Sequence, residues 1–183
     1  NNRDHRKIAV IDGHTAFTGG INMADEYMNL KERFGHWKDT AIMVKGDGAR
    51  SFLMMFLQMW NVTEKGEEDF GKYLEIDYSK VPEAAWARGY VMPYGDSPWD
   101  REPVGQYVYM DIINKAKEYV HIMTPYLILD SDMMTALTFA AKRGIQVIII
   151  MPHIPDKKYA YLLARSYYME LLLAGVQIFE YTP

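Results

Sequence analysis

The chain has 183 residues, a hydrophobic fraction of 49%, a charged fraction of 24% and a formal net charge of −4. These values exclude a disordered or fibrous chain, and the acidic balance gives no support to nucleic acid as a partner. The sequence contains no cysteine, which excludes disulfides and thiolate metal sites, and it shows neither a signal peptide nor an apolar run long enough to span a membrane.

The first part of the sequence predicts a small sheet followed by a helix. Two short apolar stretches flank Gly13-His14, which is typical of a β-hairpin. A later stretch carries apolar residues at helical spacing, and the polar, acidic residues at 61–82 predict an irregular connection. The expected elements are strands at 7–13, 15–20 and 40–46 and a helix at 48–63.

The second part of the sequence predicts regular alternation of helices and strands. A strand is expected within 86–100, ending in a loop rich in glycine and proline. Thereafter the expected helices are 104–118, 132–143 and 157–174, and the expected strands are 119–127, 145–152 and 176–181. Such alternation predicts an α/β sandwich with helices on both sides of the sheet.

The opening residues hold the densest group of reactive side chains. If His5 and Lys7 lie on an extended segment, their side chains point to the same side. An ammonium group neutralises a phosphate, and a neutral imidazole can attack its phosphorus. Gly19 and Gly20 allow a close approach of backbone to a ligand, and Asn22 adds an amide donor.

A histidine nucleophile also needs an acceptor for its other ring nitrogen. Asp12 and Asp39 are the nearby carboxylates that can serve. His153 is a further candidate, because it follows an expected strand and strand ends line ligand crevices in α/β sheets. A lone His-x-Lys pair is usually a solvated edge strand, but the full string HxKx4Dx6GGxN is far more specific.

That string reproduces the HKD motif of the phospholipase D superfamily at every defining position. The resemblance extends along the whole chain, and stretches such as "GGINMADEY" and "YYMELLLAGVQIFEYTP" resemble the bacterial cardiolipin synthase branch. It implies a phospholipase D-like α-β-α sandwich, with a mixed sheet and helices on both faces. It also implies a phosphatidyltransferase that makes cardiolipin and glycerol from two phosphatidylglycerol molecules through a phosphohistidine, without a metal or cofactor.

The resemblance assigns roles by position. His5 corresponds to the nucleophile, and Lys7, Gly20 and Asn22 correspond to phosphate-contacting positions. Asp12 corresponds to a residue that supports the loop, and Asp39 to the acidic residue that orients the histidine. Tyr126 lies in a segment that resembles one near the substrate mouth.

Enzymes of this family carry two HKD motifs that line one site, and here only His5 begins the HxKx4D spacing. The family pattern locates the second motif shortly after 176–181. We therefore expect an incomplete fold in which 1–80 is the C-terminal part of the first half and 81–183 the N-terminal part of the second. The segment alone is expected to be inactive. Helices outside it are expected to hold the parent protein at the cell membrane, with the site on the cytoplasmic side.

Two other functions stay open at this point. One is a phosphodiesterase or nuclease that forms its site by dimerising a single motif; the long sequence after the motif and the acidic balance disfavour it. The other is a non-catalytic module that binds phosphate or lipid. The expected partners are phosphatidylglycerol and a membrane surface, with no nucleic acid, and a homodimer of the segment stays open.

Overall fold

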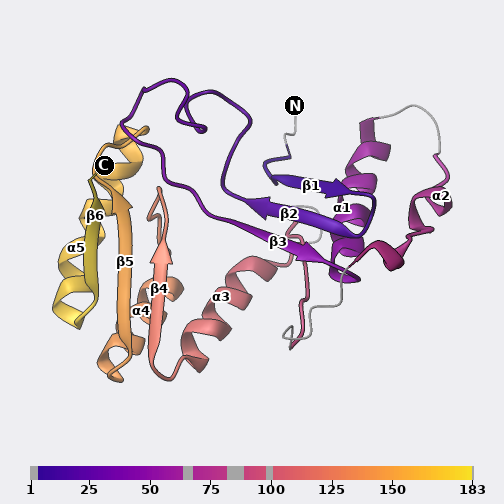
Figure 1. The fold of residues 1–183 in the computed structure, drawn as a ribbon. Helices are drawn as coiled ribbons and strands as arrows, with labels where there is room; N and C mark the ends of the chain where they lie inside the picture. The colour runs from indigo at the N-terminus through magenta and orange to yellow at the C-terminus, as the bar shows by residue number, and fades with distance from the viewer. Residues whose placement is uncertain (1–3, 64–67, 82–88, 98–100, 183) are drawn as a thin grey trace. The chain divides into compact units, whose positions relative to one another are not determined.

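The computed structural model describes residues 4–63, 68–81, 89–97 and 101–182. The chain forms two compact units (Figure 1): the first unit comprises residues 1–31 and 37–95, and the second unit comprises 32–36 and 96–183. Within the described ranges, no helix is long and apolar enough to cross a membrane. The assignment of 1–80 and 81–183 to two phospholipase D-like halves stays a prediction.

The first unit is built on an antiparallel sheet of three strands in the order β1-β2-β3. These strands are β1 (Ile8–Ile11), β2 (Thr15–Gly19) and β3 (Ala41–Lys45), and the helix α1 (Gly48–Thr63) follows. The predicted hairpin is confirmed, and its turn uses left-handed backbone at Asp12 and Gly13, with φ values of 51° and 71°. Buried Ala16 of β2 packs against Ala49 and Phe52 of α1, so the helix covers one face of this sheet.

The stretch predicted to be irregular contains two short elements, α2 (Gly71–Leu74) and the 3-10 helix η1 (Tyr78–Lys80). The strand expected within 86–100 is wrong for residues 89–97, which form no strand, and the rest of that range lies outside the described residues. Gly89 has a φ of 109°, a left-handed conformation that does not continue a strand.

The second unit contains a parallel sheet in the order β4-β5-β6. Its elements are α3 (Val104–Lys115), β4 (Tyr119–Met123), α4 (Ser131–Lys142), β5 (Gln146–Pro152), α5 (Lys158–Ala174) and β6 (Gln177–Tyr181). This is the predicted alternation: α3 and β4 end three and four residues earlier than expected, and the other bounds agree to within one residue. The α/β class is confirmed.

The core of the second unit lies between the parallel sheet and its helices. Val147, Ile149 and Met151 of β5 are buried and pack in one cluster with Leu137 of α4 and Leu171 of α5. In Figure 1 the helices α4 and α5 lie behind the same face of this sheet. The other face carries exposed apolar side chains, such as Met123 and Phe179. Among the described residues, each sheet is therefore covered by helices on one face.

The ends of the helices in the second unit follow from local chemistry. Asp130 caps α4, because its Oδ1 accepts a hydrogen bond of 2.8 Å from the backbone N–H of Met133. Gly175 ends α5 with a φ of 100°, and the chain then enters β6. These turns set the three parallel strands so that their carboxyl ends meet at one edge.

Candidate functional site

The register of the hairpin explains the spacing of the motif. Ile8 of β1 lies opposite Thr18 of β2 in an antiparallel pair. Continued by one residue towards the N-terminus, the same register sets Lys7 opposite Gly19. The chain therefore folds back at the turn so that the two ends of the motif meet, although eleven residues lie between Lys7 and Gly19.

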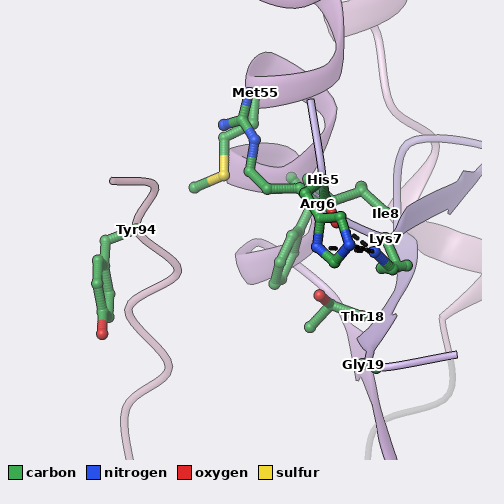
Figure 2. A pocket seen from close by; sticks show the side chains of 10 residues that line it. His5, Arg6, Lys7, Ile8, Thr18, Gly19, Met55 and Tyr94 are labelled. Atoms are coloured by element: carbon green, nitrogen blue, oxygen red, sulfur yellow. Dashed lines mark hydrogen bonds between the residues drawn. The ribbon is translucent and has the colours of Figure 1, made fainter. Parts of the chain in front are cut away.

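An open pocket of about 230 Å³ lies where these two ends meet (Figure 2). One wall is polar and comes from the motif, and the other is apolar and comes mainly from α1. Its lining residues are His5, Arg6, Lys7, Ile8, Thr18, Gly19, Gly20, Phe52, Met55 and Tyr94. All of them belong to the first unit.

His5 and Lys7 lie in direct contact at this pocket (Figure 2). The Nζ of Lys7 lies 3.0 Å from Nδ1 and 3.1 Å from Nε2 of His5, and it donates to the carbonyl oxygen of His5 at 2.6 Å. The predicted alignment of the two side chains on one side of an extended segment is present. An anion bound here meets an ammonium group and an imidazole together.

Gly19 and Gly20 bring the backbone close to its neighbours. A Cβ at Gly19 would lie 2.5 Å from the carbonyl oxygen of Thr40, and one at Gly20 would lie 2.6 Å from Oδ1 of Asp39. The carboxylate of Asp39 therefore lies over Gly20, at the edge of the pocket. Its Oδ1 accepts a hydrogen bond of 2.7 Å from the backbone N–H of Thr40.

The two candidate orienting carboxylates are not hydrogen-bonded to the histidine. Among the described residues, no such bond joins Asp12 or Asp39 to His5. Asp12 lies in the hairpin turn, at the end of β1 remote from His5. The orienting role of Asp39 and the supporting role of Asp12 stay predictions.

The remaining predicted site residues lie outside the pocket lining. Asn22 follows Gly20 by two residues, and its carbonyl oxygen accepts from the N–H of Ala24. Tyr126 belongs to the second unit, where its hydroxyl donates to Asp156. The structure thus brings together His5, Lys7 and Gly20, with Asp39 beside Gly20. Tyr126 belongs to the other unit and is not part of this group.

Sequence reasoning missed Arg6, which lines the pocket between the two motif residues. Its Nε and Nη2 donate to the carboxylate of Asp4 at 2.9 and 2.8 Å. The hydrogen bonds to Arg6 lower the pKa of Asp4, and the same side-chain contact raises the pKa of Arg6. The spacing that pairs His5 with Lys7 also pairs Asp4 with Arg6, so the alternation of an extended segment was the signal available.

A second polar cluster occupies the carboxyl edge of the parallel sheet. Nδ1 of His153 and the hydroxyl of Tyr161 each lie 2.8 Å from the carboxylate of Glu180. The bond to His153, followed by that from Tyr161, lowers the pKa of Glu180 against the opposing effect of burial, and the carboxylate raises the pKa of Tyr161. His153 therefore lies at a strand end, as expected, with a carboxylate partner.

Sequence reasoning also passed over a second His-x-Lys spacing, at His36 and Lys38. It lacks the aspartate of the full motif, because Met43 stands at that position. His36 belongs to the second unit, where its Nδ1 lies 3.2 Å from the hydroxyl of Tyr181, whereas Lys38 belongs to the first. This pair therefore does not reproduce the arrangement of His5 and Lys7.

Comparison with known proteins connects both units to one family. The family model described as "Cardiolipin synthase, PLD-like domain" matches residues 109–183, which lie in the second unit. Over its full length the chain is 59% identical to a protein of Streptococcus mutans that carries no functional name, and it covers 39% of that protein. Over 99% of its length it is 39% identical to cardiolipin synthases of Alkalihalophilus pseudofirmus and Geobacillus kaustophilus, and covers 35% of each. No solved structure was found to match the chain.

The chain spans between about a third and two fifths of the length of the curated relatives it matches. Their similarity covers the complete HKD motif in the first unit as well as the parallel sheet of the second. Over its full length the chain is therefore similar to bacterial cardiolipin synthases, and residues 109–183 match their PLD-like domain.

Proposed function

We propose that the protein is a phosphatidyltransferase of the cardiolipin synthase type and that His5 is its nucleophile. The observation that carries the proposal is the contact of His5 with Lys7 in a pocket whose opposite edge is formed by Gly19 and Gly20. The names of the 39% identical relatives give it further support. On this view the donor and the acceptor are both phosphatidylglycerol.

The reaction proceeds by two displacements at phosphorus. An imidazole nitrogen of His5 forms a bond to phosphorus while the bond to the departing glycerol breaks, and an acid supplies the proton that glycerol needs. A hydroxyl of the second phosphatidylglycerol then attacks phosphorus, the conjugate base of that acid takes the hydroxyl proton, the bond to nitrogen breaks, and cardiolipin is released. Lys7 binds a non-bridging oxygen throughout and stabilises the charge that gathers there.

The other predicted residues take supporting roles in this proposal. Gly20 lets the carboxylate of Asp39 lie against the backbone at the edge of the pocket, and Asn22, two residues further on, supplies an amide donor. Asp39 turns from the N–H of Thr40 to the ring of His5 when substrate draws Lys7 away. Asp12 holds the hairpin turn that sets the register.

The decisive experiment uses the full-length protein in mixed micelles with radiolabelled phosphatidylglycerol. His5→Ala is expected to abolish cardiolipin formation, whereas His14→Ala, a substitution in the hairpin turn, is expected to retain it. Rapid quenching of the unaltered protein is expected to trap a phosphoenzyme that is labile in acid and stable in base. Cardiolipin formation by the His5→Ala protein would reject the proposal.

Two further parts of the proposal concern the setting of the enzyme. The protein acts at a membrane surface, because its proposed substrate is a membrane lipid. The cytoplasmic side is proposed on the family resemblance alone. The 183-residue segment alone is expected to be inactive, since its pocket contains one imidazole and the departing glycerol needs a separate proton donor. Turnover of phosphatidylglycerol by the purified segment would overturn this part, and its mass in solution would show whether two copies share a site.

A further inference from the structure

The guanidinium of Arg6 is a pocket-lining group that the proposed phosphoryl chemistry does not use. Its Nε and Nη2 are bound to Asp4, and a third bond joins Oδ1 of Asp4 to the backbone N–H of Arg6 at 3.0 Å. The side chain is thereby fixed by both ends of one carboxylate. This fork geometry is the most specific that arginine makes.

The same geometry leaves one edge of the guanidinium without a bond to Asp4. Nη1 takes no part in the bonds to Asp4, and its hydrogens are donors. A Cβ at Gly95 would lie 3.0 Å from Nη1, so this edge lies against the chain that follows Tyr94. Figure 2 shows the guanidinium of Arg6 beside Met55, with Tyr94 on the far side of the pocket.

The charge of the pair decides what this edge can bind. Asp4 neutralises Arg6, so Lys7 is the cationic side chain of the pocket lining that remains to meet the single negative charge of a phosphodiester, with the carboxylate of Asp39 at the pocket edge. A neutralised guanidinium attracts a second anion weakly but still donates to a neutral oxygen. The carboxylate also prevents Arg6 from turning towards the phosphate site at His5.

We propose that Arg6, held by Asp4, is a specificity residue that binds a hydroxyl oxygen of the substrate's alcohol and does not bind its phosphate. The ligand class is a short polyol, such as the glycerol of a phospholipid headgroup. This hydroxyl belongs either to the departing or to the arriving alcohol, since both carry the same chemistry. The inference rests on the proposed function and names the part of the pocket that recognises the alcohol.

The test compares lipids with and without headgroup hydroxyls in the full-length protein. For Arg6→Leu, we expect the KM for phosphatidylglycerol to rise about tenfold or more, as for the loss of a hydrogen bond from a charged donor. The inhibition constant of phosphatidylpropanol, which has the same carbon chain without hydroxyls, is expected to stay within about twofold. The matched control is Arg50→Leu, an exposed arginine of α1 outside the pocket, and circular dichroism checks the fold of each variant.

Two arms identify the source of the hydroxyl. If Arg6 binds the departing alcohol, the KM for phosphatidylglycerol as donor rises. Glycerol re-enters the departing position in the reverse reaction, so the glycerol concentration needed for half-maximal reversal with cardiolipin rises in that case as well. If Arg6 binds the arriving alcohol, that concentration is unchanged and the KM for phosphatidylglycerol as acceptor rises. No change in either KM overturns the proposal.

Inorganic phosphate as an inhibitor separates this inference from the proposed function. Arg6→Leu is expected to leave phosphate inhibition unchanged, whereas Lys7→Ala weakens it. Asp4→Asn restores a free positive charge beside the pocket, so phosphate is expected to inhibit at a several-fold lower concentration. If Arg6→Leu weakens phosphate inhibition as much as Lys7→Ala does, Arg6 is a phosphate ligand and the inference fails. Activity of the His5→Ala protein would instead reject the function itself.

Discussion

Lys7 and His5 form a contact that needs only three consecutive residues. Nζ of Lys7 lies 3.0 and 3.1 Å from the two ring nitrogens of His5 and 2.6 Å from its carbonyl oxygen. A neutral imidazole offers a lone pair at one ring nitrogen, so one of these contacts is a hydrogen bond from the ammonium group. The proposed attack by His5 requires this lone pair, so in the proposed reaction Lys7 passes from the ring to the phosphate when substrate binds.

Replacing Lys7 tests this transfer. Lys7→Ala is expected to lower kcat/KM for phosphatidylglycerol by about a hundredfold, because a charged hydrogen bond to the phosphoryl oxygen is lost where charge develops. Lys45→Ala, at the exposed end of β3, is the matched control and should change kcat/KM by less than about twofold. A loss of only a few fold for Lys7→Ala would show that the ammonium group has no part in the chemical step.

The two glycines of the motif are expected to differ in their tolerance of a methyl group. In Gly19→Ala the new Cβ meets the backbone of Thr40 and Ala41, so β2 and β3 must move apart and the free energy of unfolding should fall by about 1–3 kcal/mol. In Gly20→Ala the three atoms nearest to the Cβ all belong to the carboxylate of Asp39, which can rotate away. A cost below about 1 kcal/mol is expected.

Urea unfolding of the single variants and of Gly20→Ala with Asp39→Ala measures these costs. The second substitution should recover most of the loss caused by Gly20→Ala, because it removes the atoms that clash. If Gly20→Ala is the more damaging of the two, or if the double variant recovers nothing, the close approach of Asp39 to Gly20 is not the cause.

Short-range structure was the part that the sequence predicted well. The hairpin and the alignment of His5 with Lys7 depend on a turn and on alternation along one strand, both of which can be read from adjacent residues. The helices and strands of the second unit followed from periodicity in the same way. The strand expected to run to residue 127 ends at Met123, because Pro125 has no N–H to offer a neighbouring strand.

Contacts that depend on folding were not predictable in this way. The approach of Asp39 to Gly20 needs the pairing of β2 with β3, and no local pattern specifies it. The sequence predicted helices on both sides of the sheet, yet the side chains of β5 from Val147 to Pro152 alternate between buried and half-buried. Arg6 was overlooked because a charged residue on an exposed segment is ordinarily a solvated one.

The pair formed by Glu180 and His153 predicts a dependence of stability on acid. The pKa of Glu180 is lowered in the folded protein, mainly by the hydrogen bond from His153 and next by that from Tyr161. A lowered carboxyl pKa contributes stability that is present above the unfolded value of about 4.3 and is lost as the pH falls through the folded value. Since the side chains of His153 and Glu180 are 55% and 29% exposed, we expect a contribution below about 1 kcal/mol.

Urea unfolding between about pH 5 and pH 3 measures this contribution. The unaltered protein should lose more free energy of unfolding over this range than Glu180→Gln does, and His153→Ala should behave like Glu180→Gln. Glu170→Gln, an exposed glutamate of α5, serves as the control and should follow the unaltered protein. Parallel curves for Glu180→Gln and the unaltered protein would show that the pair contributes nothing.

Tyr126 and Asp156 offer a separate test of a residue predicted to lie near the substrate mouth. The hydroxyl of Tyr126 donates to the carboxylate of Asp156 and so ties the chain after β4 to the chain before α5. Tyr126→Phe and Asp156→Asn should each lower the free energy of unfolding by about 0.5–1.5 kcal/mol. In a double-mutant cycle, the two effects should be less than additive by about 0.5 kcal/mol or more.

Kinetics on the same variants separate a structural role of Tyr126 from contact with substrate. Both substitutions break the hydrogen bond, but only Tyr126→Phe removes the phenolic hydroxyl. Contact with substrate therefore predicts a KM for phosphatidylglycerol that rises several-fold more in Tyr126→Phe than in Asp156→Asn. Equal changes in KM would mean that the hydroxyl acts only through Asp156, and Tyr126 would then hold the edge of the sheet without touching the lipid.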